Sequence, residues 1–361
     1  MTFLKKLIIQ LFGSKTHCNA ADFAKVNTIL IRPLGEAVGD AIVHAAYAAQ
    51  LKSVYPNAQI SILVSERNRE IFSYTPAIDK IVTRKQWYFF FKMRHKVDLL
   101  LDFYESFTTS DILRDWLLQP KISVIFHKRS KKIYNLETLS NYDYYFPPKD
   151  SAHFAQRMEQ SGLSQHIPLP PVQLSLDIPT SEIESISYLW KENNNNRKIR
   201  ILIAPQGSQP ERLIPTIEIA KIINNIPESI LSKIHFILGN TYGMSIYLKE
   251  LKSLCPKAIL LLSPPTKLSQ YVALTASSDL VICVDSGTVH LACSLQKPLL
   301  CFYANLVENI KLWRPLPHQD TPCLMIISNE SPGCRSTKNF SSTPAIHWLT
   351  AQLDTIFNHI K

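Results

Sequence analysis

Apolar runs rich in valine and isoleucine recur along the chain and alternate with segments of helical periodicity. This alternation is typical of parallel sheets whose two faces are covered by helices. In the first half it predicts strands at residues 28–32, 59–64, 80–83, 97–101 and 122–126, with helices at 40–54 and 152–160. In the second half it predicts strands at 199–204, 233–238, 258–262, 279–284 and 298–302, with helices at 215–225, 268–276 and 289–295. The pattern therefore predicts an α/β protein built from two doubly wound halves.

A proline-rich segment lies between these halves. Its prolines are Pro168, Pro170, Pro171 and Pro179, a spacing that regular structure does not easily continue through. A chain of 361 residues also favours two domains. We expect an N-terminal domain over residues 1–165, a linker over 166–180 and a C-terminal domain over 181–361, with a cleft between the domains. Ligands of open α/β sheets bind at the carboxyl ends of the strands, so the chemistry is expected in the loops found there.

The composition, 46% hydrophobic and 19% charged, is that of a globular protein. Seven cysteines are scattered along the chain, and none forms a Cys-x-x-Cys pair. Several lie inside apolar runs, so we expect buried, reduced thiols in a cytosolic protein rather than disulfides or a metal site. They are Cys18, Cys255, Cys283, Cys293, Cys301, Cys323 and Cys334.

The N-terminal stretch MTFLKKLIIQLFG places a basic pair before a short apolar patch. It lacks the hydrophobic core and cleavage site of a signal peptide, and no segment of the chain is long and apolar enough to cross a bilayer. The stretch predicts a short helix, lying either on a membrane surface or against the rest of the protein.

The formal net charge is +10, from 39 Lys and Arg against 29 Asp and Glu, and two basic clusters at residues 92–96 and 127–132 lie in the first half. Such clusters suit nucleic acid, acidic lipid or an anionic substrate, although a solvated face is the ordinary explanation of any one of them. No RNA- or DNA-binding motif accompanies them, which makes a nucleic-acid-binding protein a distant alternative. No Gly-x-Gly-x-x-Gly follows the first strand, which argues against a Rossmann dehydrogenase.

The stretch Asp285-Ser286-Gly287-Thr288 joins a predicted strand to a predicted helix. A helix start carries about half a positive charge and unsatisfied N–H groups, so it suits a phosphate or diphosphate. Gly287 lets the backbone approach such a ligand closely. The alternative is a capped helix whose Asp or Ser satisfies the same donors. For His290 a ligand contact and a core position are equally open.

Residues 285–292 and 295–298 together resemble the signature of glycosyltransferase family 9, the lipopolysaccharide heptosyltransferases: D-[ST]-G-x-x-H-x-A, then L-x-K-P. Three other stretches agree in order and spacing. Residues 29–32 with 38–40 are similar to the family's opening strand and Gly-Asp helix start, residues 55–60 to its Y-P-x-A-x-I, and residues 204–208 to its P-G-x-S loop. The resemblance spans residues 26–315.

This resemblance implies the GT-B fold, two Rossmann-like doubly wound domains facing a cleft, with the last helix able to pack back on the first domain. It implies that the second domain holds ADP-heptose and that heptose passes, with inversion and without a metal or other cofactor, to the inner core of lipopolysaccharide or lipooligosaccharide. The implied acceptor is an anionic Kdo-containing lipid at the cytoplasmic face of the inner membrane. Another nucleotide sugar or acceptor in surface polysaccharide assembly stays open, and the oligomeric state is not indicated.

Asp40 matches the family's catalytic aspartate. An acceptor alcohol attacks an anomeric carbon poorly until its proton is being removed, so a base is needed there. A carboxylate at a helix start can also be a simple cap. The segment between Arg32 and Gly39 is longer than is usual in the family, and Glu36 is therefore kept as an alternative base.

The leaving diphosphate needs donors already in place, which Ser286, Gly287 and Thr288 can supply. Family members often carry a lysine after the P-G-x-S loop. Here Arg212 is the expected replacement, able to hold a phosphate with two hydrogen bonds, and the family's K-x-W-P pattern is missing. The other donor-binding candidates are Gln206, Gly207, Ser208, Asn240, Asp285 and His290.

An acceptor with carboxylates and phosphates calls for cations in the first half. The candidates are Arg67, Arg69, Lys128, Arg129, Lys131 and Lys132. The same surplus charge favours an anionic membrane leaflet. The aromatic run at residues 87–91 is predicted either to rest on the lipid boundary or to belong to the core.

Overall fold

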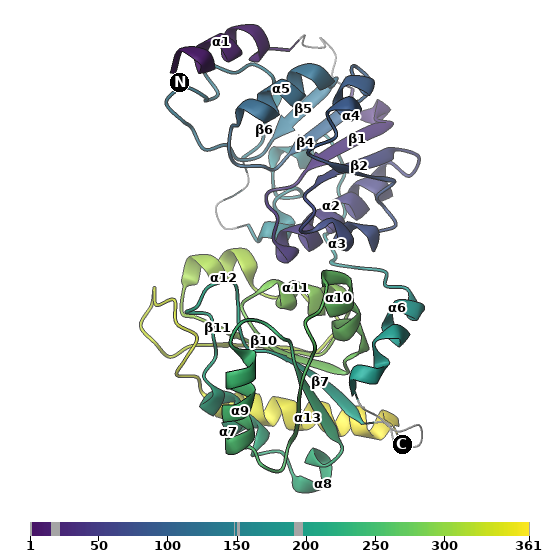
Figure 1. Cartoon of the computed structure of the whole chain (residues 1–361). Helices are drawn as coiled ribbons and strands as arrows, with labels where there is room; N and C mark the ends of the chain where they lie inside the picture. Colours follow the sequence, from purple (N-terminus) through teal and green to yellow (C-terminus); the bar gives the residue numbers. More distant parts are fainter. Residues whose placement is uncertain (1, 16–21, 148, 150–151, 191–197, 361) are drawn as a thin grey trace. The chain divides into compact units, whose positions relative to one another are not determined.

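A computed structural model describes residues 2–15, 22–147, 149, 152–190 and 198–360. The chain forms two compact units that meet at Val172 and Gln173, within the proline-rich segment (Figure 1). Cys18 and most of the polar run at 191–198, which the sequence suggests as an exposed loop, lie outside the described residues. No helix of the described chain combines the length and apolar character needed to cross a bilayer.

Unit 1 contains a parallel sheet with the strand order β3-β2-β1-β4-β5-β6. Its strands are β1 (Thr28–Arg32), β2 (Gln59–Val64), β3 (Lys80–Thr83), β4 (Leu99–Asp102), β5 (Ile122–Ile125) and β6 (Tyr144–Tyr145). Its helices are α1 (Thr2–Phe12), α2 (Val38–Val54), α3 (Arg69–Ser73), α4 (Trp87–Lys92) and α5 (Thr109–Leu118). The order reverses between β1 and β4, which makes this pair the topological switch point.

Unit 2 repeats the same topology, with the order β12-β11-β10-β7-β8-β9 and the switch point between β7 and β10. Its strands are β7 (Ile199–Ala204), β8 (Ile234–Leu238), β9 (Ile259–Leu262), β10 (Leu280–Val284), β11 (Leu299–Tyr303) and β12 (Cys323–Ile327). Its helices are α6 (Thr180–Ser185), α7 (Thr216–Ile223), α8 (Glu228–Leu231), α9 (Met244–Leu254), α10 (Leu268–Ser277), α11 (Gly287–Ser294), α12 (Val307–Trp313) and α13 (Ser342–Ile360). The last helix, α13, packs against α7 and β12 of its own unit. The predicted α/β class with two doubly wound sheets is confirmed.

Aspartates set the register at the amino ends of several strands. Asp79 precedes β3 and accepts a hydrogen bond from the Ile60 N–H at 2.7 Å, and Asp98 precedes β4 and accepts from the Thr28 N–H at 3.0 Å. In unit 2, Asp279 precedes β10 and accepts from the Arg200 N–H at 2.8 Å. Each carboxylate satisfies a backbone donor of the neighbouring strand. These charged residues therefore begin buried strands without interrupting them.

The helix predicted at 152–160 is wrong, because only the short 3-10 turn Phe154–Gln156 forms there. The Phe154 carbonyl accepts from the Arg157 N–H of this turn and from the Tyr47 hydroxyl of α2. The N-terminal helix is confirmed as α1. Of the described cysteines, all are free thiols, and Cys255, Cys283, Cys293 and Cys301 are buried.

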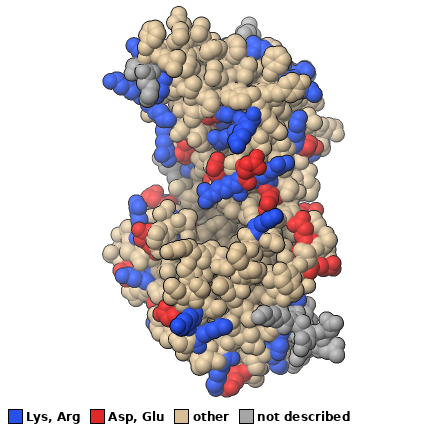
Figure 2. Space-filling view, in the orientation of Figure 1, with Lys and Arg blue, Asp and Glu red and all other residues tan. Residues whose placement is uncertain are grey.

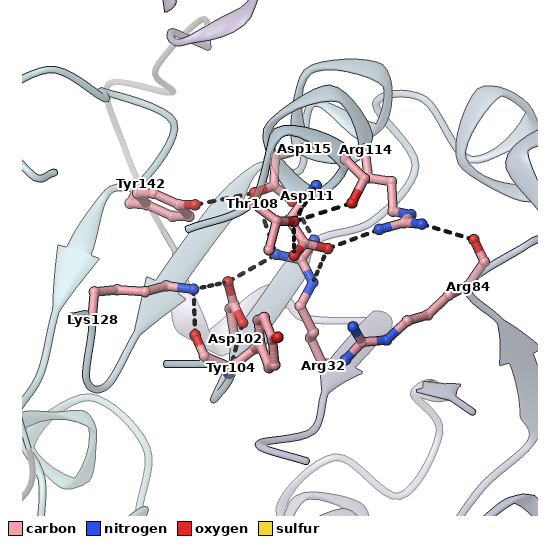
Figure 3. A network of polar contacts seen from close by, with 11 residues as sticks. Arg32, Arg84, Asp102, Tyr104, Thr108, Asp111, Arg114, Asp115, Lys128 and Tyr142 are labelled. Atoms are coloured by element: carbon pink, nitrogen blue, oxygen red, sulfur yellow. Dashed lines mark hydrogen bonds and ion pairs between the residues drawn. The ribbon is translucent and has the colours of Figure 1, made fainter. Parts of the chain in front are cut away.

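A buried ion network joins the carboxyl ends of β1 and β4 to α5 (Figure 3). Arg32, the last residue of β1, is fully buried and donates to Asp102, the last residue of β4, at 2.8 Å. Its guanidinium also pairs with Asp115, and Lys128 reaches Asp102 at 2.6 Å. Asp111 and Arg114 pair at 2.9 Å and complete three cations facing three carboxylates. The balance of charge makes the burial tolerable, since an unpaired buried ion would cost several kcal/mol.

Replacing the central guanidinium tests this account. Arg32→Met should lower the free energy of unfolding by about 3–5 kcal/mol, because it leaves Asp102 and Asp115 buried without their main partner. The measurement is urea unfolding followed by circular dichroism. Lys25→Met, which removes an exposed pair with Asp22, is the control and should cost less than about 1 kcal/mol. Equal losses in the two variants would contradict the network's importance.

Candidate active site

The loops at the switch point of unit 2 carry most of the donor-site residues expected from the sequence. One loop follows β7 and holds Gln206, Gly207 and Ser208, and the other follows β10 and begins with Asp285. Parallel strands end at one edge of the sheet, and β7 and β10 are neighbours, so these loops lie side by side.

Arg212 and Asp285 form the charged centre of this site. Arg212 Nη1 lies 3.2 Å from Asp285 Oδ2, and Asn309 Nδ2 of α12 donates to the same oxygen at 2.6 Å. Burial raises the pKa of Asp285, while Arg212 and the Asn309 hydrogen bond oppose the rise. The Arg212 side chain keeps 27% of its surface exposed, against 8% for Asp285. The cation is thus positioned by a buried carboxylate and still open to a ligand.

A cavity of about 380 Å³ adjoins this centre. It is lined by Gln209, Glu211, Arg212, Asp285, Ala304, Leu306, Asn309 and Arg335. Arg335 is exposed and supplies a second cation at the cavity wall. Neither Asn309 nor Arg335 stands out in the sequence, because both lie far along the chain from the loops they join.

Gly207 is packed too closely for any other residue. A Cβ there would lie 2.8 Å from the Asp285 carbonyl oxygen and 2.8 Å from Arg212 Cβ. Its N–H donates to the Arg212 carbonyl at 2.7 Å, which closes the loop. The glycine therefore lets the Arg212 segment lie directly against the end of β10.

The start of α11 is capped by its own side chains. Ser286 Oγ accepts from the Thr288 N–H at 3.3 Å, and the Thr288 hydroxyl pairs with the Tyr271 hydroxyl at 2.8 Å. Ser286 and Gly287 are half-buried, and Thr288 is buried. His290 is buried with its ring edge-on to Trp313, at a centroid distance of 5.5 Å. The exposed part of this helix start is thus Ser286 and Gly287, whereas Thr288 and His290 pack inward.

The loop after β8 is tied to the same edge. The Thr241 hydroxyl donates to Gln206 Oε1 at 3.2 Å, and the Asn240 N–H donates to Ser263 Oγ at 3.0 Å. Ser208 is exposed beside them. The ends of β7, β8 and β10 therefore form one connected surface of unit 2.

In unit 1, Asp40 lies in the first turn of α2, at the carboxyl edge of the sheet next to β1. Burial raises the pKa of Asp40 to about 6, the Ala37 N–H lowers it, and the charge of Glu105 raises it further. A Cβ on Gly35 would overlap Asp40 Oδ2, so the preceding loop folds directly over the carboxylate. Glu36 is exposed by contrast. A half-buried carboxylate that titrates close to neutrality suits a general base better than an exposed one.

His44 positions this loop and was not singled out by the sequence. Its Nε2 accepts from the Leu34 N–H at 3.3 Å, and its Nδ1 lies 2.6 Å from the Asp40 carbonyl oxygen. The acceptor at Nε2 requires the proton on Nδ1, hence a neutral ring. Burial lowers the pKa of His44 to about 4, in agreement. The ring therefore fixes the loop before α2 without adding charge next to Asp40.

The six cations expected at the acceptor site divide into five that are exposed and one, Lys128, that is buried. Arg67 and Arg69 are exposed in a segment that Asn68 ties to the Gly35 carbonyl at 3.3 Å, so this segment adjoins the Asp40 loop. Arg129 pairs with Glu105 at 2.7 Å.

Lys131 and Lys132 are exposed farther along the same segment as Arg129. Lys128 differs from the other cations, because its ammonium is buried between Asp102 and the Tyr104 carbonyl. We therefore correct the expectation for Lys128 and assign it to the buried network. Within the described residues, no group of three or more His, Cys, Asp or Glu side chains could hold a metal ion.

The fold and these loops define a protein of two Rossmann-like units, with a partly exposed arginine beside a cavity at the carboxyl edge of the second sheet. Comparison with known proteins narrows this class. The chain belongs to glycosyltransferase family 9, because the family model described as heptosyltransferase matches residues 158–343. Comparison with curated protein sequences finds no match.

Solved structures of the same GT-B class agree with the fold. The E. coli ADP-heptose lps heptosyltransferase II is 17% identical with a TM-score of 0.71, covering 91% of this chain and 99% of the other. A glycosyl transferase family 9 protein from Veillonella parvula is 14% identical with a TM-score of 0.70, covering 91% and 97%. E. coli heptosyltransferase WaaC with ADP is 14% identical with a TM-score of 0.65, covering 90% and 99%. At these identities the likeness concerns the fold.

The two close-packed glycines should respond differently to a methyl group. Gly207→Ala should lower the free energy of unfolding by about 1–3 kcal/mol, because one neighbour of the new Cβ is a backbone carbonyl that cannot turn aside. Gly35→Ala should cost about 1 kcal/mol or less, because the Asp40 carboxylate can rotate away. Urea unfolding of both variants measures the difference, and similar losses would contradict it.

Proposed function

We propose that this protein transfers heptose from ADP-heptose to the inner core of lipopolysaccharide or lipooligosaccharide, with inversion and without a metal. The acceptor would be an anionic Kdo-containing lipid at the cytoplasmic face of the inner membrane. Membership of glycosyltransferase family 9 supports the reaction class. The observation that carries the donor assignment is the half-exposed Arg212, held by Asp285 and Asn309 beside the Ser286–Gly287 helix start.

The reaction begins with the acceptor hydroxyl. Asp40 accepts its proton as the oxygen attacks the anomeric carbon of the sugar from the side opposite the diphosphate. A new C–O bond forms to the acceptor while the bond from the anomeric carbon to the phosphate oxygen breaks. A single displacement of this kind inverts the anomeric centre. The raised pKa of Asp40 supports this assignment, because a stronger base drives the proton transfer better.

The departing ADP carries away the bonding electrons, and its growing charge needs stabilisation. Arg212 would supply a cation able to make two parallel hydrogen bonds, and the Ser286–Gly287 backbone would supply the positive end of α11. Asp285 has two functions in this proposal. It orients Arg212 in the absence of substrate, and it can accept a hydrogen bond from a sugar hydroxyl when phosphate engages the arginine.

A second candidate keeps the reaction and changes the donor. Arg212 stands where family members often have lysine, and the K-x-W-P pattern is missing. A different nucleotide sugar, used in surface polysaccharide assembly, would fit such a departure. Thermal-shift binding of ADP, UDP, GDP, CMP and ADP-heptose with EDTA present separates the two. Selective stabilisation by ADP and ADP-heptose is expected, and a shift with UDP or CMP alone would overturn the heptose assignment.

Removal of the base should abolish most turnover. Asp40→Asn is expected to lower kcat by about 10²–10⁴-fold with ADP binding unchanged, whereas Glu36→Gln, the matched exposed carboxylate, should retain activity. Loss of activity in Glu36→Gln with a fully active Asp40→Asn would move the base to Glu36. Single-turnover assays with each purified variant give the rates.

The pH dependence follows from the same carboxyl. Asp40 must be ionised to accept a proton, so kcat/KM should fall as the pH decreases through about 6, its raised pKa. Glu105→Gln removes a negative charge that helps to raise this pKa. The fall of kcat/KM on the acid side of the pH profile should therefore move to lower pH. An unchanged profile in Glu105→Gln would show that another group controls this fall.

Arg212 can be tested by binding alone. Arg212→Ala should weaken ADP binding by about ten- to a hundredfold, since a hydrogen bond to a charged group contributes about 1.5–3 kcal/mol. The affinity of Arg212→Lys for ADP should lie between those of Arg212→Ala and the native protein, because lysine keeps the positive charge but lacks the two parallel N–H donors of the guanidinium. Lys221→Ala, an exposed cation on α7 of the same unit, is the control. Calorimetric affinities equal to the native value in Arg212→Ala would remove this residue from the donor site.

A further inference from the structure

The outer face of α1 is apolar and uncovered within unit 1. Its inner face packs Ile8, Ile9 and Phe12 against α5 and the segment around Tyr134. The outer face presents four large apolar side chains, with exposed fractions of 81% for Phe3, 59% for Leu4, 39% for Leu7 and 56% for Leu11. At 3.6 residues per turn these four lie within an arc of about 100°. They form one continuous stripe rather than scattered exposed residues.

The helix that carries this stripe is firmly attached. Phe12 packs edge-on against Trp116 of α5 at 4.9 Å, and the Phe12 carbonyl accepts from Asn141 Nδ2 at 3.1 Å. Just after the helix, the Lys15 ammonium donates to the Pro120 carbonyl at 2.8 Å and pairs with Asp143. A loosely attached segment could bury its leucines elsewhere on the protein. This helix holds them outward.

The charge around the stripe is positive. Residues 1–21 contain no Asp or Glu, and the lysines of α1 are Lys5 and Lys6, whereas Lys15 is buried and paired with Asp143. Lys5 lies over the Tyr134 ring at 5.6 Å, which brings the exposed Lys131 and Lys132 segment next to α1. In the view of Figure 2 the end of unit 1 that holds α1 is largely uncharged, with Lys and Arg at its margin. Glu137 is the acidic residue of this neighbouring segment.

A second exposed apolar element lies across α5 from α1. Helix α4 packs on α5 as α1 does (Figure 1). It exposes Tyr88 and Phe91, while Phe89 and Phe90 are buried. A groove of about 500 Å³ runs along it, lined by Lys80, Lys85, Gln86, Trp87, Tyr88, Phe89, Lys92 and Met93. The aromatic run at 87–91 thus divides between core and surface. Its exposed part again combines aromatic rings with lysines.

We propose that the α1 stripe, with the exposed aromatics of α4, binds the surface of a bilayer that contains anionic phospholipid. A helix with leucine and phenylalanine on one side and lysine beside them is suited to lie in the plane of a membrane interface, with the apolar residues among the acyl chains and the cations at the headgroups. The positive margin is the reason for choosing a bilayer over an apolar protein surface. The proposed function supplies only the biological reason for this binding, since a lipid-anchored acceptor would lie at such a surface.

Vesicle co-sedimentation of the full chain tests the proposal without donor or acceptor, so its outcome is separate from that of the glycosyltransfer reaction. The protein should bind vesicles of phosphatidylethanolamine with phosphatidylglycerol at least about tenfold more tightly than vesicles of phosphatidylcholine, and salt should weaken the binding. Phe3→Ser combined with Leu4→Ser and Leu11→Ser should reduce binding about tenfold or more. Tyr88→Ser with Phe91→Ser should reduce it less.

The matched control is Tyr242→Ser with Ile246→Ser, two side chains of unit 2 that are 96% and 74% exposed, and it should bind vesicles as the native chain does. Circular dichroism of each variant checks the fold, which exposed substitutions should leave intact. Native-like vesicle binding by the α1 variant would overturn the proposal. So would a native dimer, seen by light scattering, that the α1 substitutions dissociate, because the stripe would then cover a second copy of this chain.

Discussion

The fully buried guanidinium of Arg32 is the group on which the carboxyl edge of the unit 1 sheet depends. It sits where the strand order reverses, and it must be matched there by Asp102 from β4 and Asp115 from α5. Burying these ions is tolerable only when all of them are paired, so the ends of the two strands and helix α5 are fixed together. The loops that leave this point carry Asp40 on one side and Glu105 on the other. The ion network therefore holds the starting points of both loops in place.

Unit 2 places an arginine and an aspartate at the equivalent switch point, with a different outcome. Arg212 and Asp285 are joined by a 3.2 Å ion pair, but the arginine is partly exposed and a cavity adjoins it. A sealed pair such as Arg32 and Asp102 cannot exchange partners without exposing an ion to an apolar interior. Arg212 is partly exposed, so it can bind a phosphate without entering an apolar interior, while Asn309 still donates to Asp285. The same topology thus supports a structural ion pair in one unit and a candidate ligand site in the other.

Burial and the negative charge of Glu105 raise the pKa of Asp40, and neutral groups shape the loop around it. Gly35 brings the loop over the carboxylate, neutral His44 fixes the loop, and desolvation raises the pKa. A protonated imidazole at the same place would stabilise the ionised carboxylate and lower its pKa. A carboxylate whose pKa is raised in this way favours proton acceptance near pH 6 and above. The exposed cations Arg67 and Arg69, in the segment that adjoins the Asp40 loop, are then left for an anionic substrate in the proposed reaction.

The sequence by itself determined the α/β class, most strand positions and the loops that hold the candidate site, because hydrophobic periodicity and glycine placement are local properties of the chain. It also proposed Asp40, Arg212 and Asp285 as candidate site residues. Tertiary structure alone decided which of these groups meet. Asn309 joins Arg212 only through folding, Lys128 is buried, and a 3-10 turn that the Tyr47 hydroxyl of α2 contacts replaces the helix expected at 152–160. Such outcomes depend on contacts between residues far apart along the chain. A local sequence pattern does not show which of these residues become desolvated or which of them pair.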